Sequence, residues 1–172
     1  MVEGMSNNIE KVSTHDLFPI IEELLACNKQ AIFTISGYSM LPFMGSQRDQ
    51  VLLGKRDFEG LKRGEIILFK LDCGKYILHR IYKVTDEGYL TMGDGNLHYD
   101  GIIRPEQVIG VVEKIYRKNK EIDCSSTWFK IMSNIWMALL SVRKYILKLY
   151  HFMHFCKKKV KVFFSNDKEV RS

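Results

Sequence analysis

The sequence predicts a mainly β fold: an antiparallel, barrel-like domain preceded by an amphipathic helix and followed by a second helix. Short apolar runs rich in β-branched and aromatic residues follow one another between residues 31 and 116, which is typical of strands. Turns containing Gly and Asp, such as Asp72-Cys73-Gly74 and Asp86-Glu87-Gly88, separate these runs, as in antiparallel sheets and small barrels. The chain is 46% hydrophobic and 27% charged, a composition that excludes a disordered or fibrous protein.

The pattern of apolar residues divides the chain into four parts. Apolar residues from Leu17 to Leu25 recur at helical spacing, with Glu22 and Glu23 on the other side, so a helix of about three turns is expected here. The strands are expected at 31–35, 51–53, 66–69, 76–84, 89–92 and 108–116. The predicted parts are an N-terminal helix region (1–30), a β-domain (31–122), a basic apolar C-terminal helix (126–164) and a tail (165–172).

The positive charge of the chain lies in its C-terminal segment. Eight basic residues and no acidic residue occur between Cys124 and Phe164, which is more than the whole net charge of +6. The longest uncharged run of this segment, Ile131–Val142, has 12 residues, whereas a membrane-spanning helix needs about 20. A basic, aromatic-rich helix is typical of one lying on an anionic membrane surface, which we expect for residues 128–161. Packing on the β-domain, dimerisation and a true span stay open as alternatives.

Other partners and targeting signals are not expected from the sequence. Nucleic-acid binding is not expected, because the aromatic-rich helix favours an apolar medium. The first 13 residues are polar and do not resemble a secretory signal. The four cysteines are widely separated and form no C-x-x-C pair, so we expect neither a zinc site nor a disulfide, and no cofactor.

A serine stands in a short turn directly after the first expected strand. Gly37 precedes Ser39 by two residues and permits a tight backbone, while Pro42 follows by three and stops regular structure. Such a turn exposes one hydroxyl at a strand end. On these residues alone, an ordinary turn serine is the simpler interpretation.

A histidine and two acids follow this serine in the β-domain. Along strand 76–84, an alternation of two places His79 on the same face as Ile77 and Ile81, as expected for either a core histidine or a site residue. Asp94 and Asp100 lie in the next Gly- and Asp-rich turn. Serine, histidine and an acid are the components of an activated hydroxyl nucleophile, in which the imidazole accepts the serine proton.

The order and flanks of these residues resemble the signal peptidase I and LexA-like superfamily of serine peptidases. Gly37-Tyr38-Ser39-Met40-Leu41-Pro42 is similar to the box around the family's nucleophile, and Leu78-His79-Arg80-Ile81 to the box that carries its general base. The remaining similar segments are Gly64-Glu65-Ile66-Ile67-Leu68-Phe69, where Glu65 replaces the usual Asp, Gly93-Asp94-Gly95-Asn96 with Asp100, and Val108-Ile109-Gly110-Val111-Val112. The resemblance covers about residues 31–116 in the family's order.

The resemblance implies roles for the candidate site residues. Ser39 is expected as nucleophile, His79 as general base and Asp100 as the acid that orients it, with Asp94 a supporting or structural acid. Histidine in place of lysine at the base points to the archaeal and endoplasmic-reticulum type of signal peptidase. The Ser39 backbone N–H would bind the oxyanion, whereas Gly37 cannot supply the hydroxyl that some relatives add. Arg80 is expected at the surface or in an ion pair.

The function implied is a serine endopeptidase that cleaves a leader or signal peptide by acyl transfer. Two alternatives stay open: an autoprocessing regulatory protein of LexA type, and an inactive membrane- or partner-binding module of the same fold. No membrane anchor precedes the serine box, unlike in typical signal peptidases, and 30 residues leave no room for a helix-turn-helix. The expected location is the membrane, peripherally or by a short anchor, or the cytoplasm.

Overall fold

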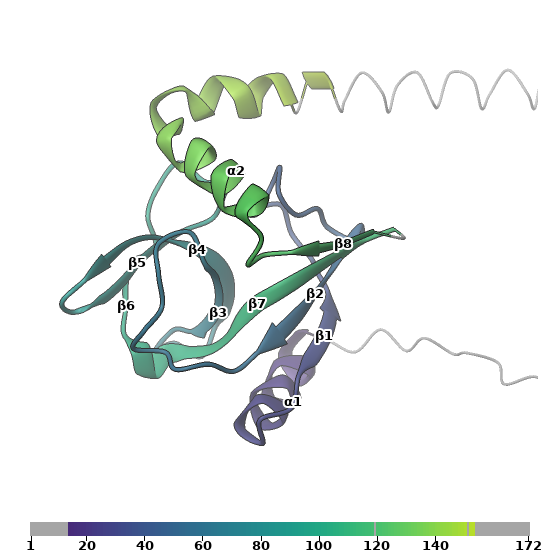
Figure 1. The fold of residues 1–172 in the computed structure, drawn as a ribbon, viewed down its shortest axis with the longest axis vertical. Coiled ribbons are helices and arrows are strands. Elements are labelled where there is room, and N and C mark those ends of the chain that lie inside the picture. Colours follow the sequence, from purple (N-terminus) through teal and green to yellow (C-terminus); the bar gives the residue numbers. More distant parts are fainter. Residues whose placement is uncertain (1–13, 119, 151, 154–172) are drawn as a thin grey trace, which may run out of the picture.

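The fold is mainly antiparallel β, as the sequence predicts. The computed structural model describes residues 14–118, 120–150 and 152–153 (Figure 1). A helix, α1 (Thr14–Ala26), precedes the sheet, and α2 (Thr127–Ala138) follows it. The eight strands are β1 (Ala31–Thr34), β2 (Asp49–Gly54), β3 (Ile66–Lys70), β4 (Tyr76–Thr85), β5 (Gly88–Met92), β6 (Gly101–Ile103), β7 (Val108–Arg117) and β8 (Lys120–Asp123).

The strands pair in the order β1-β2-β7-β3-β4-β5-β6, and β8 adds to β7. All pairs are antiparallel, because hairpins and short loops connect most neighbours in sequence. β7 pairs with β2 along its length, but its other edge pairs first with β3 and then with β8. Within the described residues β1 and β6 remain edge strands, and the curled sheet does not close on itself (Figure 1).

The larger part of the core lies between α1 and the strands. Ile21 and Leu25 of α1 pack against Phe33, Leu53 and other buried apolar side chains of the strands. Burying each such side chain contributes about 1.5–3 kcal/mol relative to exposure. A second cluster, which includes Phe69 and Ile81, occupies the region between β3, β4 and β5. β4, the strand that carries His79, is therefore supported by this second cluster.

The C-terminal helix is not continuous, in contrast to the single helix predicted over 126–164. Ser126 caps α2 by accepting a hydrogen bond from the Phe129 N–H at 3.3 Å. α2 ends at Ala138, Leu139 lies in a turn, and residues 140–150 form a second helical segment. Residues 154–164 lie outside the described part of the chain. None of the described helices combines the length and the apolar character that crossing a bilayer requires.

Candidate active site

The serine turn belongs to a loop that folds back on its own base. The Gln47 N–H donates to the Ile35 carbonyl at 2.8 Å and so closes the loop that joins β1 to β2. At the mouth of this loop the Asp49 carboxylate is fully buried and accepts hydrogen bonds from the Gly45 N–H, from Arg48 and from Arg117. The conformation of the loop is therefore held by a cluster of charged side chains.

The Asp49 carboxylate stays ionised although it is buried. Burial alone would raise its pKa, but hydrogen bonds from Arg117, then from Arg48 and the Gly45 N–H, lower the pKa to about 2. Arg117 also donates to the Phe43 carbonyl, and so it binds the loop at two points. Sequence reasoning did not identify this anchor, because Arg117 lies 68 positions from Asp49 along the chain.

Ser39 is half-buried at the turn of this loop, between an exposed and a buried neighbour. Tyr38 is 71% exposed, whereas Met40 is buried in the core. Gly37 adopts a φ of +90°, which favours glycine, and its N–H donates to the Ser46 hydroxyl at 3.2 Å. The bond between Leu41 and Pro42 is cis. The serine box of the sequence thus forms a defined turn that ends at a buried methionine.

His79 of β4 is buried and contacts Asp100. Its Nδ1 lies 2.6 Å from the Asp100 Oδ2 atom, which also accepts a hydrogen bond from the Thr91 hydroxyl at 2.9 Å. Because a carboxylate can only accept, the proton is assigned to Nδ1, and Nε2 keeps its lone pair. This is the tautomer that a general base requires. Of the two acids that the sequence offers, Asp100 is the one in contact with His79.

The turn of residues 93–96 brings Ser39 and His79 together. The Gly95 N–H donates to the Ser39 carbonyl at 2.7 Å. A Cβ atom on Gly93 would lie 2.4 Å from the Ser39 carbonyl oxygen, 2.8 Å from His79 Nε2 and 2.9 Å from Asn96 Nδ2. Nε2 therefore faces the serine turn, and only glycine at position 93 permits this approach.

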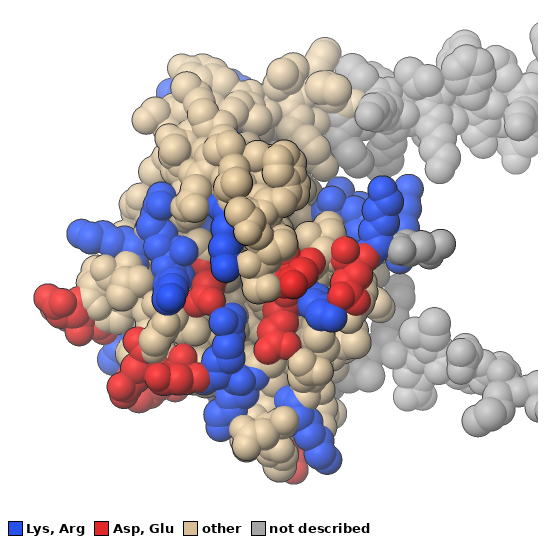
Figure 2. Space-filling model, in the orientation of Figure 1, with Lys and Arg blue, Asp and Glu red and all other residues tan. Residues whose placement is uncertain are grey.

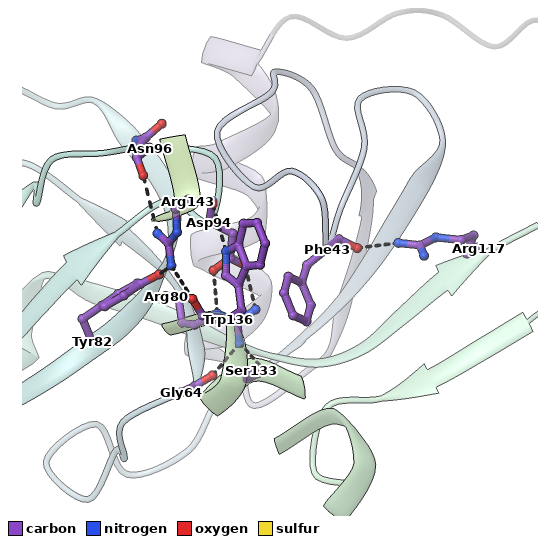
Figure 3. A network of polar contacts seen from close by, with 10 residues as sticks. All are labelled: Phe43, Gly64, Arg80, Tyr82, Asp94, Asn96, Arg117, Ser133, Trp136 and Arg143. Carbon is purple, nitrogen blue, oxygen red and sulfur yellow. Dashed lines mark hydrogen bonds and ion pairs between the residues drawn. The ribbon is translucent and has the colours of Figure 1, made fainter. Parts of the chain in front are cut away.

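Asp94 has a different partner. It forms a buried, two-pronged ion pair with Arg80, with nitrogen–oxygen distances of 2.8 and 2.6 Å (Figure 3). Arg80 also donates to the Gly64 carbonyl and to Ser133 of α2, both at 2.8 Å. The ion pairing expected for Arg80 is present, but its side chain is fully buried and not at the surface. Asp94 has the contacts of a structural acid that holds the 93–96 turn.

A groove of about 840 Å³ runs past these residues. Its polar part includes Ser39, His79, Asp100 and Asn96. Its apolar part is formed by side chains of α1, the end of β1 and the beginning of β4, namely Phe18, Phe33, Ile35, Tyr76 and Leu78. The groove can accommodate an extended peptide segment with apolar side chains.

Two polar groups among the described residues of the site, the Ser39 hydroxyl and the Asn96 amide, do not hydrogen-bond to His79. Among the described residues no hydrogen bond joins the Ser39 hydroxyl to His79, and such bonds commonly tighten only when substrate binds. The Asn96 side-chain amide lines the groove beside Nε2 and has no hydrogen-bond partner in the described part of the chain. Sequence reasoning gave Asn96 no role, although it ends the Gly93-Asp94-Gly95-Asn96 segment.

The described residues contain no group of three or more His, Cys, Asp or Glu side chains that could hold a metal ion. Cys27, Cys73 and Cys124 are free thiols, and burial raises the pKa of Cys124 to about 12. Comparison of the sequence with protein-family models and with curated proteins finds no match.

Proposed function

We propose that this protein is a serine endopeptidase of signal-peptidase type that uses Ser39, His79 and Asp100. One observation carries the proposal: His79 donates through Nδ1 to Asp100 and turns Nε2 toward the serine turn. Serine and histidine 40 positions apart in sequence thereby line one groove. This arrangement fits a nucleophile, a base and an orienting acid better than it fits a core histidine.

The mechanism follows from the geometry. The Ser39 hydroxyl attacks the scissile carbonyl of a peptide in the groove, and His79 Nε2 accepts its proton. Asp100 stabilises the imidazolium that forms, and the Ser39 N–H donates to the oxyanion. The imidazolium then gives its proton to the leaving amine. Water, deprotonated by the same Nε2, releases the acyl group and restores Ser39.

The order of the boxes on the sheet supports a fold of LexA and signal-peptidase type. The serine box precedes β2, the Gly64 segment leads into β3, and the histidine box is on β4. The Gly93 segment follows β5, and the last box begins β7. Barrel-like closure stays a proposal, since the pairing among the described strands leaves β1 and β6 as edge strands.

The substrate proposed is a leader or signal peptide, bound extended with its apolar side chains against Phe33, Tyr76 and Leu78. Signal-peptidase-like relatives prefer small residues before the cut, and we propose the same preference here. Action on such a substrate implies work at a membrane surface, in peripheral association.

Cleavage of a synthetic leader peptide tests the proposal. Wild type is expected to release a single fragment, and Ser39→Ala and His79→Ala are expected to reduce kcat/KM by at least about 10³-fold. His98→Ala is the matched control, because His98 is exposed near the site but outside the groove. Equal cleavage by wild type, Ser39→Ala and His79→Ala would overturn the proposal.

A further inference from the structure

The C-terminal helices use their inner side to hold the active-site loops. Trp136 of α2 donates its indole N–H to the Asp94 carbonyl at 3.0 Å. In the second segment, Arg143 is fully buried and donates to the Tyr82 hydroxyl and to the Trp136 carbonyl (Figure 3). This inner side is therefore occupied, and the segments have a fixed orientation on the domain.

The second helical segment also extends over the serine loop. The Arg143 Nη1 atom donates a hydrogen bond to the Asn96 carbonyl of the 93–96 turn at 3.5 Å. Tyr150 of this segment interacts with Arg48 of the serine loop. The hydrogen bond to Asp49 raises the pKa of Arg48, and a hydrogen bond with Tyr150 adds to this rise. The segment therefore reaches from one loop of the candidate site to the other.

The outer side of the same helices is apolar and exposed. Eight large apolar side chains between residues 128 and 153 are at least 44% exposed, and they recur every three or four residues on one side of each segment. We call them the docking face: Trp128, Ile131, Ile135, Val142, Tyr145, Leu149, Phe152 and Met153. They are more than half of the large apolar residues exposed in the described part of the chain. Exposed apolar surface of this extent marks an interaction site.

The charged residues of the helices that carry the docking face are all basic. Lys130, Lys144 and Lys148 are exposed along one edge of the docking face, and the Lys144 ammonium lies 4.8 Å from the centre of the Tyr145 ring. No acidic residue occurs in this part of the sequence. Figure 2 shows few charged side chains over α2 and the following segment, whereas acids and bases alternate over the sheet below.

We propose that the docking face binds the interface of an anionic lipid bilayer. Trp and Tyr favour the headgroup level, aliphatic side chains enter the acyl boundary, and lysines pair with anionic lipids. A second copy of this chain is disfavoured as the occupant, because two such faces would oppose lysine to lysine. Lipid binding is independent of the chemistry at Ser39, and it places the loops of the candidate site next to the membrane.

Vesicle binding by the full-length protein tests this assignment. We expect co-sedimentation with vesicles of phosphatidylcholine and phosphatidylglycerol, and at least tenfold weaker binding to phosphatidylcholine alone. The exposed Trp128 is expected to shift its fluorescence to shorter wavelength on binding, whereas Trp136 is already buried. Tyr145→Glu with Leu149→Glu is expected to weaken binding at least tenfold.

The matched control is Ile32→Glu with Ile102→Glu, which introduces the same charges at exposed residues of β1 and β6 and is expected to bind like wild type. Circular dichroism of each variant verifies folding. Unchanged binding of the Tyr145/Leu149 variant would overturn the proposal, because other lysines would then suffice. Absence of binding by wild type would also overturn it, as would lipid-free dimerisation that the same substitutions abolish.

Discussion

At the scale of single residues, the geometry of the candidate site depends on two glycines. Gly93 lets His79 Nε2 and the Ser39 carbonyl approach the same backbone atom, and Gly95 donates its N–H to that carbonyl. Any Cβ at Gly93 would meet a backbone oxygen at 2.4 Å, which only a shift of the turn could relieve. The glycines of this turn therefore determine how closely His79 and the backbone of Ser39 can approach.

Asn96 supplies the polar group next to this contact, and its replacement is the first prediction. Its amide lines the groove beside Nε2 without a partner, so it is available to the substrate or to the hydrolytic water. Asn96→Ala is expected to lower kcat about 10²-fold with little change in KM, the size of one lost transition-state donor. Asn134→Ala, at an exposed asparagine that bonds Arg63, is expected to leave kcat unchanged. A parallel loss in both variants would contradict the role given to Asn96.

Asp49 predicts a defined acid sensitivity. Its folded pKa of about 2 lies below its ordinary value of 3.8, so its ionisation stabilises the fold above pH 4. This contribution is lost as the pH falls from about 4 toward 2. Asp49→Asn is therefore expected to lower the free energy of unfolding at pH 7, and the difference from wild type should shrink toward pH 2. Urea denaturation at both pH values measures it, and a constant difference would refute the assignment.

At the scale of elements, one buried ion pair connects β4, the turn after β5 and α2. Arg80 and Asp94 are both fully buried, and Phe43 and Phe129 lie over the guanidinium at 4.7 and 5.5 Å. Ser133 of α2 accepts a further hydrogen bond from Arg80. The pair supports the 93–96 turn of the candidate site, and α2 adds a hydrogen bond to it.

Breaking this pair is expected to be costly. Asp94→Ala leaves the Arg80 charge buried without a counter-ion, so we expect a loss of about 3–5 kcal/mol in the free energy of unfolding. Asp72→Ala removes an exposed ion pair with Arg104 and is expected to cost less than about 1 kcal/mol. Thermal or urea unfolding compares the two. A loss at Asp94 as small as that at Asp72 would show that the pair is not the support described.

Much of the strand pattern could be predicted from the sequence, because alternation and Gly- or Asp-rich turns act locally. The six expected strands are all present, and the helix over Thr14–Ala26 ends near the predicted Asn28. β6 and β8 were not predicted, because β6 follows directly on the Gly- and Asp-rich turn and β8 contains a single apolar residue, Ile122. The single C-terminal helix was also wrong: its apolar spacing continues through Leu139, and only tertiary contacts reveal the turn there.

The candidate site was predicted in part. Ser39, His79 and Asp100 line one groove, because the boxes fall on adjacent strands and turns. The burial of Arg143 could not be predicted, because its partner Tyr82 lies 61 positions away and its charge suggested solvent. Asp49 was missed because its partner Arg117 lies 68 positions away, and Asn96 because only the folded turn places its amide in the groove.

At the scale of the whole molecule, the sheet supports a groove and the C-terminal helices support the loops that form its polar end. The groove runs between α1, β1 and β4, while α2 and residues 140–150 lie on the 93–96 turn and reach the serine loop. The C-terminal segment thus supports the loops of the candidate site on its inner side and carries the docking face on its outer side. The helices that carry the docking face therefore contact the same turn that approaches Ser39 and His79.

Labelling by a peptide-based acylating probe tests the central claim most directly. Intact mass and peptide mapping are expected to show one adduct per chain, on Ser39, formed at least about 10³-fold more slowly in His79→Ala and at the wild-type rate in His98→Ala. An adduct on another residue, no adduct, or equal labelling rates with and without His79 would contradict the claim that His79 activates Ser39.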